Sequence, residues 1–352
     1  SIENDKLIVK KSDPKSDNFD AIIFANHDIE EVNIPSNIKR IECYSFNLCE
    51  KLQKVTFSEN SELEFIGEFA FLESELKSII LPSKVSKLDK KWFSCSKLST
   101  VKIMKGNCHF SSIENDNIIV SKTDPKSDNF DAIIFANRDI EEVNIPSNIK
   151  RIEYRSFNLC EKLQKVTFSE NSELEYIGRY AFSESGIKSI FIPPTVKLID
   201  KGAFNNCNEL QEVTFSNDSQ LQTIEESAFS NTSIVKIVIP SNLTTIGKRC
   251  FESCQELTEV TIPNDSKLKI IGKGSFSGSS ITSITIPKHV TIIRKFAFDF
   301  CTKLKNVKLE KGSKIRSISS DAFSYCYELK KIELSDDLNI LFFDKNAFTC
   351  SS

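Results

Sequence analysis

Cysteine is the residue type whose number and spacing first suggest chemistry in this chain. There are eleven cysteines in 352 residues, and six of them fall at one recurring sequence position. These six are Cys49, Cys160, Cys207, Cys254, Cys301 and Cys326. Most lie two repeat units apart, roughly 10 Å, which exceeds the ~7 Å Cα separation that a disulfide allows. We therefore expect buried free thiols that pack as small hydrophobes, and a bridge between the adjacent-unit pairs Cys301–Cys326 or Cys326–Cys350 is the alternative.

Metal ligation has little support in the spacing of possible ligands. Cys250 and Cys254 are four residues apart, but no second pair and no nearby histidine completes a tetrahedral set. Two groups of aspartates offer oxygen ligands for Ca²⁺, namely Asp13, Asp17 and Asp20, and Asp124, Asp128 and Asp131. Neither has the D-x-D-x-D-G spacing of a calcium loop, so solvated turns are the favoured interpretation. We predict no metal site.

The histidines do not indicate a catalytic site. His27, His109 and His289 fall in different repeats, and Arg138 replaces His27 in the duplicated segment described below. The sequence has no nucleophile elbow, P-loop or dinucleotide fingerprint. We therefore expect a protein that is not an enzyme, with no catalytic residues and no cofactor.

Composition limits the classes of partner. Hydrophobic residues make up 39% and charged residues 27%, enough apolar material for a continuous core. The formal net charge is −3 and no long basic run occurs, which argues against nucleic acid and anionic membrane as partners. No apolar stretch is long enough to span a membrane, and Ser1 to Lys11 lack the apolar segment of a signal peptide. Composition does not indicate an oligomeric state.

Two nested repeats organise the chain. Residues from Ser1 onward recur from Ser112 onward, and Asn18–Asn26 is identical to Asn129–Asn137. A shorter period of 22 to 25 residues also runs through the chain. Its units begin at Ile29, Leu52, Leu76, Leu98, Ile140, Leu163, Ile187, Leu210, Ile234, Leu257, Ile281, Leu304 and Leu329. The interval from Leu98 to Ile140 is longer by about one unit, which indicates an insertion.

The repeated unit predicts a stacked fold. In L-x-x-[IV]-x-[IFL]-P the fourth and sixth positions share one face of a strand, and Pro ends that strand because it has no N–H to donate. The following I-[GD]-x-x-[AS]-F-x-x-C segment has apolar residues at helical spacing, which predicts a short helical turn. One unit cannot bury these residues alone, so successive units must stack. We predict a solenoid of mixed α/β repeats, mostly β, with a parallel sheet on its concave face and short helical turns and loops on the other side.

The insertion and the N-terminus each predict a hairpin. Leu7–Val9 with Ala21–Phe24, and Ile118–Val120 with Ala132–Phe135, are β-prone runs that flank turn-forming sequences. The predicted organisation is an N-terminal hairpin or cap at 1–28, a first repeat block at 29–110, a hairpin insertion at 111–139 and a second block at 140–352. We expect the two blocks to form one continuous solenoid.

Units such as LTEVTIP…KLKIIGKGSF, with their A-F-x-x-C neighbours, resemble the BspA-like (Treponema-type) leucine-rich repeats of bacterial and protist surface proteins. The resemblance covers about Ile29 to Cys350, and the inserted segment also resembles the strand-turn-strand insertions of that family. It implies a cell-surface or secreted protein that takes part in adhesion.

Binding is expected on the outward side chains of the strands. Phe191 is an aromatic residue among threonines, and exposed aromatics on a polar sheet are typical of contact anchors. The candidate partner-binding residues on this sheet face are Phe191, Thr167, Thr214, Val238, Lys236, Thr261, Glu259 and Thr285. Alternating Glu and Lys residues on neighbouring strands also fit a solvated, self-compensating surface.

The leading hypothesis is a non-enzymatic binding or adhesion ectodomain that recognises a host or cell-surface protein or glycan through the sheet face. The alternative is an intracellular leucine-rich-repeat scaffold for protein–protein interaction. An enzyme is a third hypothesis, which only a pocket with a convergent acid, base or nucleophile would support.

Overall fold

Two compact units, Ser1–Arg138 and Asp139–Ser352, make up the chain. The structure is a computed structural model and describes residues 2–3, 6–93, 97–333, 342–344 and 346–351. These residues form β-strands, bridges and turns. No helix is found among them, and hence no helix that is long and apolar enough to cross a membrane.

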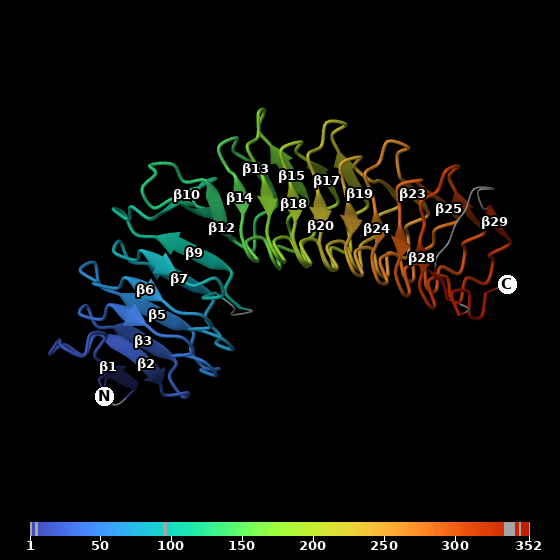
Figure 1. Cartoon of the computed structure of the whole chain (residues 1–352). Helices are drawn as coiled ribbons and strands as arrows, with labels where there is room; N and C mark the ends of the chain where they lie inside the picture. Colours follow the sequence, from blue (N-terminus) through green and yellow to red (C-terminus); the bar gives the residue numbers. More distant parts are fainter. Residues whose placement is uncertain (1, 4–5, 94–96, 334–341, 345, 352) are drawn as a thin grey trace. The chain divides into compact units, whose positions relative to one another are not determined.

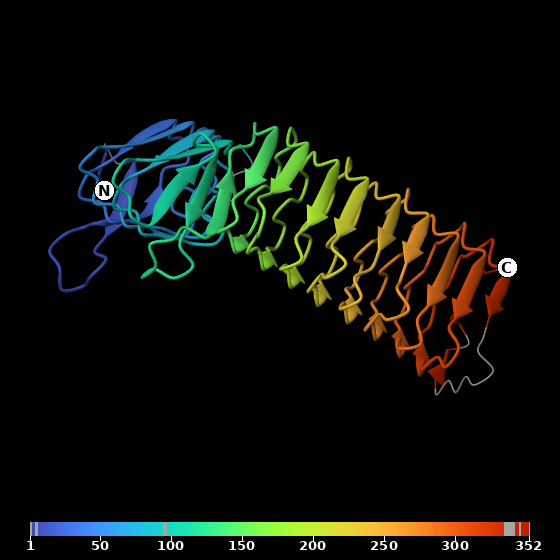
Figure 2. The same ribbon diagram turned by 90° about the horizontal axis from the view of Figure 1, so that it is seen from above.

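The second unit is a coil of stacked turns, each with one longer strand (Figures 1 and 2). These strands are β13 (Glu142–Ile145), β15 (Lys165–Phe168), β17 (Ser189–Ile192), β19 (Glu212–Phe215), β21 (Lys236–Val238), β23 (Glu259–Thr261), β25 (Ser283–Ile286), β27 (Asn306–Leu309) and β29 (Lys331–Glu333). They pair in parallel in two sheets, β13 to β23 and β25 to β29, which confirms the predicted parallel arrangement.

A second parallel sheet runs along the same turns and was not predicted from the sequence. Its strands have two residues each, and they lie in the second half of each turn (Figure 2). They are β14 (Arg151–Ile152), β16 (Tyr176–Ile177), β18 (Leu198–Ile199), β20 (Thr223–Ile224), β22 (Thr245–Ile246), β24 (Ile270–Ile271), β26 (Ile292–Ile293), β28 (Ser317–Ile318) and β30 (Phe342–Phe343). The V-x-x-I segment of the repeat therefore builds a sheet of its own.

The prediction of a short helical turn around each repeated Phe is wrong. Arg155 and Leu159, two residues on either side of Phe157, have φ values of 54° and 61°, in the left-handed region. The Phe157 N–H donates to the Ala181 carbonyl of the next turn at 2.7 Å. Because this N–H bonds between turns and not back along its own turn, as a helix requires, the segment forms a chain of tight turns.

A column of stacked phenylalanines runs through the core of the second unit. Neighbouring rings are stacked with centroids 4.8 to 5.5 Å apart and interplanar angles of 10° or less. The members are Phe157, Phe182, Phe204, Phe229, Phe251, Phe276, Phe298 and Phe323, all at most 1% exposed. Ring stacking adds to the free energy of burial.

The first unit uses the same repeat. Its longer strands β3 (Glu31–Ile34) and β5 (Lys54–Phe57) pair in parallel, as do β7 (Ser78–Leu81) and β9 (Thr100–Ile103). The shorter strands are β4 (Arg40–Ile41), β6 (Phe65–Ile66) and β8 (Lys87–Leu88).

Antiparallel strands at both ends of the first unit confirm the two predicted hairpins. β1 (Leu7–Lys10) pairs with β2 (Ala21–Ala25), and β11 (Ile118–Ser121) pairs with β12 (Ala132–Ala136). A third strand, β10 (Phe110–Ile113), also pairs with β11 and was not predicted. Because β2 pairs in parallel with β4, the first hairpin continues the sheet that the short strands of the first unit form.

Candidate functional site

The longer strands β13 to β27 of the second unit expose every second side chain. Phe191 on β17 is 48% exposed and Val238 on β21 is 57% exposed, while Ile190 and Ile237 beneath them are 2% exposed. All eight candidate binding residues are exposed, as the period-two alternation requires. Phe191 and Val238 are therefore apolar groups on a face that is otherwise mostly polar.

The sheet opens between β19 and β21, as it does between β15 and β17, which are also joined by a single pair. The pairs β17–β19 and β21–β23 extend over four and three residues, whereas β19 and β21 are joined by a single pair, Glu212 with Lys236. Beyond this pair the two strands are not hydrogen-bonded partners.

A proline lies two residues beyond β21, at the end of this opening. On β15 the corresponding ladder bond runs from the Ser169 N–H to the Ile145 carbonyl of the preceding turn at 3.0 Å. Pro240 occupies the position of Ser169 in the β21 turn, and it has no N–H with which to bond the Phe215 carbonyl.

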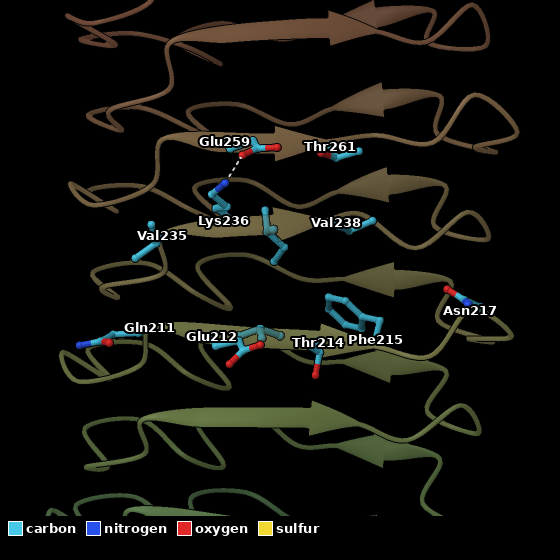
Figure 3. Close-up of a pocket in the computed structure, with 12 residues that line it drawn as sticks. Gln211, Glu212, Thr214, Phe215, Asn217, Val235, Lys236, Val238, Glu259 and Thr261 are labelled. Atoms are coloured by element: carbon cyan, nitrogen blue, oxygen red, sulfur yellow. Dashed lines mark ion pairs between the residues drawn. The ribbon is translucent and has the colours of Figure 1, made fainter.

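A groove of about 510 Å³ occupies the opening between the two strands. Figure 3 shows the ring of Phe215 in the gap between its own strand and the strand that carries Val238. Phe215 is half-buried, unlike the fully buried Ile192 and Ile239 at the same strand position. The groove therefore has an apolar floor made by Phe215 and Val238.

Charged groups lie at the opposite end of the groove. The Lys236 ammonium pairs with the Glu259 carboxylate at 2.6 Å, shown as a dashed line in Figure 3. Glu212 also lines the groove, and among the described residues no ion pair to it is found. The groove thus combines an apolar floor, one ion pair and one carboxylate that is free to meet a partner.

Five of the eight predicted binding residues come together in this groove. They are Thr214, Lys236, Val238, Glu259 and Thr261. The other three lie outside its lining: Phe191 is in register with Thr214 on the far side of β19, Thr167 donates to the Asn144 side chain at 3.0 Å, and Thr285 belongs to the β25–β29 sheet.

Phe215 is a groove residue that sequence reasoning missed. The repeat pattern placed its position in the core, where isoleucine is buried in the proline-containing turns. A signal was present, because phenylalanine takes this position in turns with an extra polar residue, as in FSNDSQL.

The cysteine row is part of the core and offers no reactive site. The Cys207 thiol donates to the Phe182 carbonyl at 2.9 Å and contacts the Ser185 hydroxyl at 3.4 Å. Burial raises the pKa of Cys207 to about 11, so the reactive thiolate is disfavoured. All six cysteines of the row are buried free thiols, and Cys350 is an exposed free thiol. Cys95 lies outside the described residues.

The aspartate groups stabilise turns. Asp20 accepts hydrogen bonds from the Ser12 N–H and hydroxyl, both at 2.8 Å, and Asp131 makes the same pair of contacts with Thr123. No cluster of three or more potential metal ligands is found within the described ranges.

Comparison with known proteins places these features in a family. The family model described as "BspA type Leucine rich repeat region (6 copies)" matches residues 17–121, 128–258 and 222–352. A search of the curated proteins finds no match.

Two solved structures share the fold. A leucine-rich repeat protein from Bacteroides ovatus is 23% identical, with a TM-score of 0.59, and the match covers 96% of this chain and 91% of that one. A leucine-rich repeat protein from Eubacterium ventriosum is 19% identical, with a TM-score of 0.50 and coverage of 93% and 84%. Together with the repeats and the stacked turns, the family match shows that this chain belongs to the BspA-type leucine-rich-repeat family.

Proposed function

We propose that this chain is a non-enzymatic recognition module of a cell-surface or secreted protein. It binds a protein partner through the exposed sheet face of its second unit, centred on the groove between β19 and β21. The observation that carries the proposal is the pairing of Phe215 and Val238 in a groove on an otherwise polar sheet. Apolar anchors within a polar rim are typical of the energetic centre of a protein–protein interface.

Charge and shape favour a protein side chain as the group that enters the groove. An apolar side chain of the partner would contact Phe215 and Val238, while a cationic one beside it would meet Glu212. Thr214 and Thr261 offer hydroxyl groups at the rim. A glycan is the alternative ligand, and the intracellular scaffold is the alternative setting.

The proposal is tested by the binding of the fluorescently labelled 352-residue chain to intact cells. Val238→Asp places a charge in the groove and is expected to lower binding by at least about 10-fold, a hot-spot effect. Ile80→Asp is the matched control, because Ile80 is 48% exposed at the same strand position of β7 in the first unit. We expect this control to bind like the parent.

Treatment of the cells separates the possible partners. Protease treatment should abolish the part of the binding that Val238→Asp lowers, and enzymatic removal of glycans should leave that part unchanged. The reverse result would replace the protein partner with a glycan, and equal binding by both aspartate variants would remove the groove from the site. An antibody against the chain should label intact cells of the source organism; labelling only after permeabilisation would favour the scaffold.

A further inference from the structure

Positive charge is concentrated in one part of the second unit. Residues 267–316 contain twelve Lys and Arg but only two Asp and Glu, a formal charge of +10 in a chain whose total is −3. The charges are interrupted by apolar core residues, so they do not form a continuous basic run. Whether these cationic residues lie close together in space depends on how the turns stack.

The short-strand sheet aligns several of these cations. Ile270 of β24, Ile292 of β26 and Ser317 of β28 are register partners. Lys269 and Arg316 directly precede the first and last of them, and so lie two turns apart, about 10 Å. The Thr291 N–H donates to the Lys269 carbonyl, and the Arg316 N–H donates to the Thr291 carbonyl, both at 2.8 Å.

A second row lies beside the first. Lys267 and Lys314 each stand three residues before their strand, and the Lys314 N–H donates to the Lys288 carbonyl at 2.8 Å. We call the resulting exposed group the cationic edge. It consists of Lys267, Lys269, Lys288, Lys314 and Arg316.

In earlier turns the lysines at this edge form ion pairs with glutamates, unlike the described residues of the cationic edge. Lys150 pairs with Glu173 at 3.9 Å, and Lys197 pairs with Glu175 at 2.8 Å. Within the part of the chain that the structure describes, no member of the cationic edge forms an ion pair. The carboxylate of Glu310 accepts the Lys288 backbone N–H at 3.1 Å, and Lys267 donates to the Asn242 side chain at 2.7 Å.

We propose that the cationic edge binds a linear polysaccharide that carries sulfate and carboxylate groups. Such a chain can run along the solenoid axis and meet a cation at successive turns, with release of counterions from both surfaces. This site is on the short-strand sheet and is therefore distinct from the groove between β19 and β21.

A polysaccharide is favoured over single-stranded nucleic acid by what lies beside the cations. The half-buried positions that start β24, β26 and β28 are Ile270, Ile292 and Ser317. None offers the aromatic surface on which bases stack in proteins that bind single strands. The ring of Phe296, which is half-buried in the same part of the chain, already has Lys295 over its face at 4.6 Å from its centroid.

Charge reversal with a matched control tests this site. The probe is a fluorescent heparin oligosaccharide, titrated with the 352-residue chain at about 150 mM NaCl. The double variant Lys269→Glu, Arg316→Glu should weaken binding at least about 10-fold, because each cation at an anionic surface contributes appreciably to affinity. Lys150→Glu, Lys197→Glu changes the net charge equally at the same position of the repeat and should bind like the parent.

Three outcomes would overturn the proposal: no binding by the parent, equal losses in the two double variants, or binding of a single-stranded DNA of matched charge as tight as that of heparin. Tighter binding to phosphatidylserine vesicles than to heparin would show that the cationic edge binds an anionic membrane surface and not a polysaccharide. Thermal unfolding checks that both double variants fold. If Lys269→Glu, Arg316→Glu does not fold, Lys269→Gln, Arg316→Gln replaces it.

Discussion

The rings of Phe204 and Phe229, which lie on adjacent turns, stack with 5.1 Å between their centroids and 1° between their planes. Each is fully buried, and each backbone N–H bonds to the turn that follows, at 2.8 and 2.9 Å. The same side chain thus packs between turns while its own backbone links them. Loss of one ring should therefore weaken two interfaces at once.

Phe229→Ala is expected to lower the free energy of unfolding by about 3–5 kcal/mol, because it removes a buried ring and leaves a cavity between two neighbours. Chemical denaturation with circular dichroism measures the change. Phe191→Ala is the matched control, since Phe191 is 48% exposed on the sheet face and its truncation should cost less than about 0.5 kcal/mol. Equal losses in both variants would contradict the assignment of Phe229 to the core and of Phe191 to the surface.

Alkylation should separate the cysteines into two classes. Cys43, Cys108 and Cys350 are exposed free thiols and should react with iodoacetamide in the native chain. Cys207 and Cys254 are buried and hydrogen-bonded to backbone carbonyls, so they should react only after denaturation. Peptide mass spectrometry reads out each site. A reducing agent should leave the melting temperature unchanged, and a large drop would reveal a disulfide.

Stability should decline at alkaline pH. Burial raises the pKa of Cys207 and of Cys254 from 9.0 to about 11. Between these values the unfolded chain has lost protons that the folded chain keeps, so the contribution of these thiols is complete below about pH 9 and is lost as the pH rises to about 11. Melting temperatures across this range should fall less steeply for the double variant Cys207→Ser, Cys254→Ser than for the parent. Parallel curves would show that the buried thiols do not titrate in this range.

Gly186 marks a position where two turns approach closely. A Cβ there would lie 2.0 Å from the Glu161 carbonyl oxygen, which is backbone and cannot move aside. Gly186→Ala should therefore destabilise the chain by about 1–3 kcal/mol, as overpacking does. Gly312 has φ of +76° but no heavy atom within 4 Å of such a Cβ, so Gly312→Ala should cost only about 1 kcal/mol, the strain of a left-handed alanine. A larger loss at Gly312 than at Gly186 would contradict this account.

The sequence by itself determined the repeat, the family and the alternation of buried and exposed side chains. Phe229 and Ile237 could be placed in the core because the period of two along a strand and the recurrence of one apolar position are local properties of the chain. The two hairpins followed from turn-forming residues between β-prone runs in the same way.

Only the tertiary structure decided which residues of different turns meet. The turns around each Phe are not helical, because every second N–H, such as that of Phe157, bonds to the next turn, and bonds between turns leave no trace in the spacing of one unit. Pro240 ends its strand, as its chemistry predicts, but the groove beside Phe215 depends on how far β19 and β21, which belong to different turns, pair with each other. Lys269 and Arg316 are 47 residues apart in the sequence and lie on one edge, about 10 Å apart, only because β24, β26 and β28 stack in register.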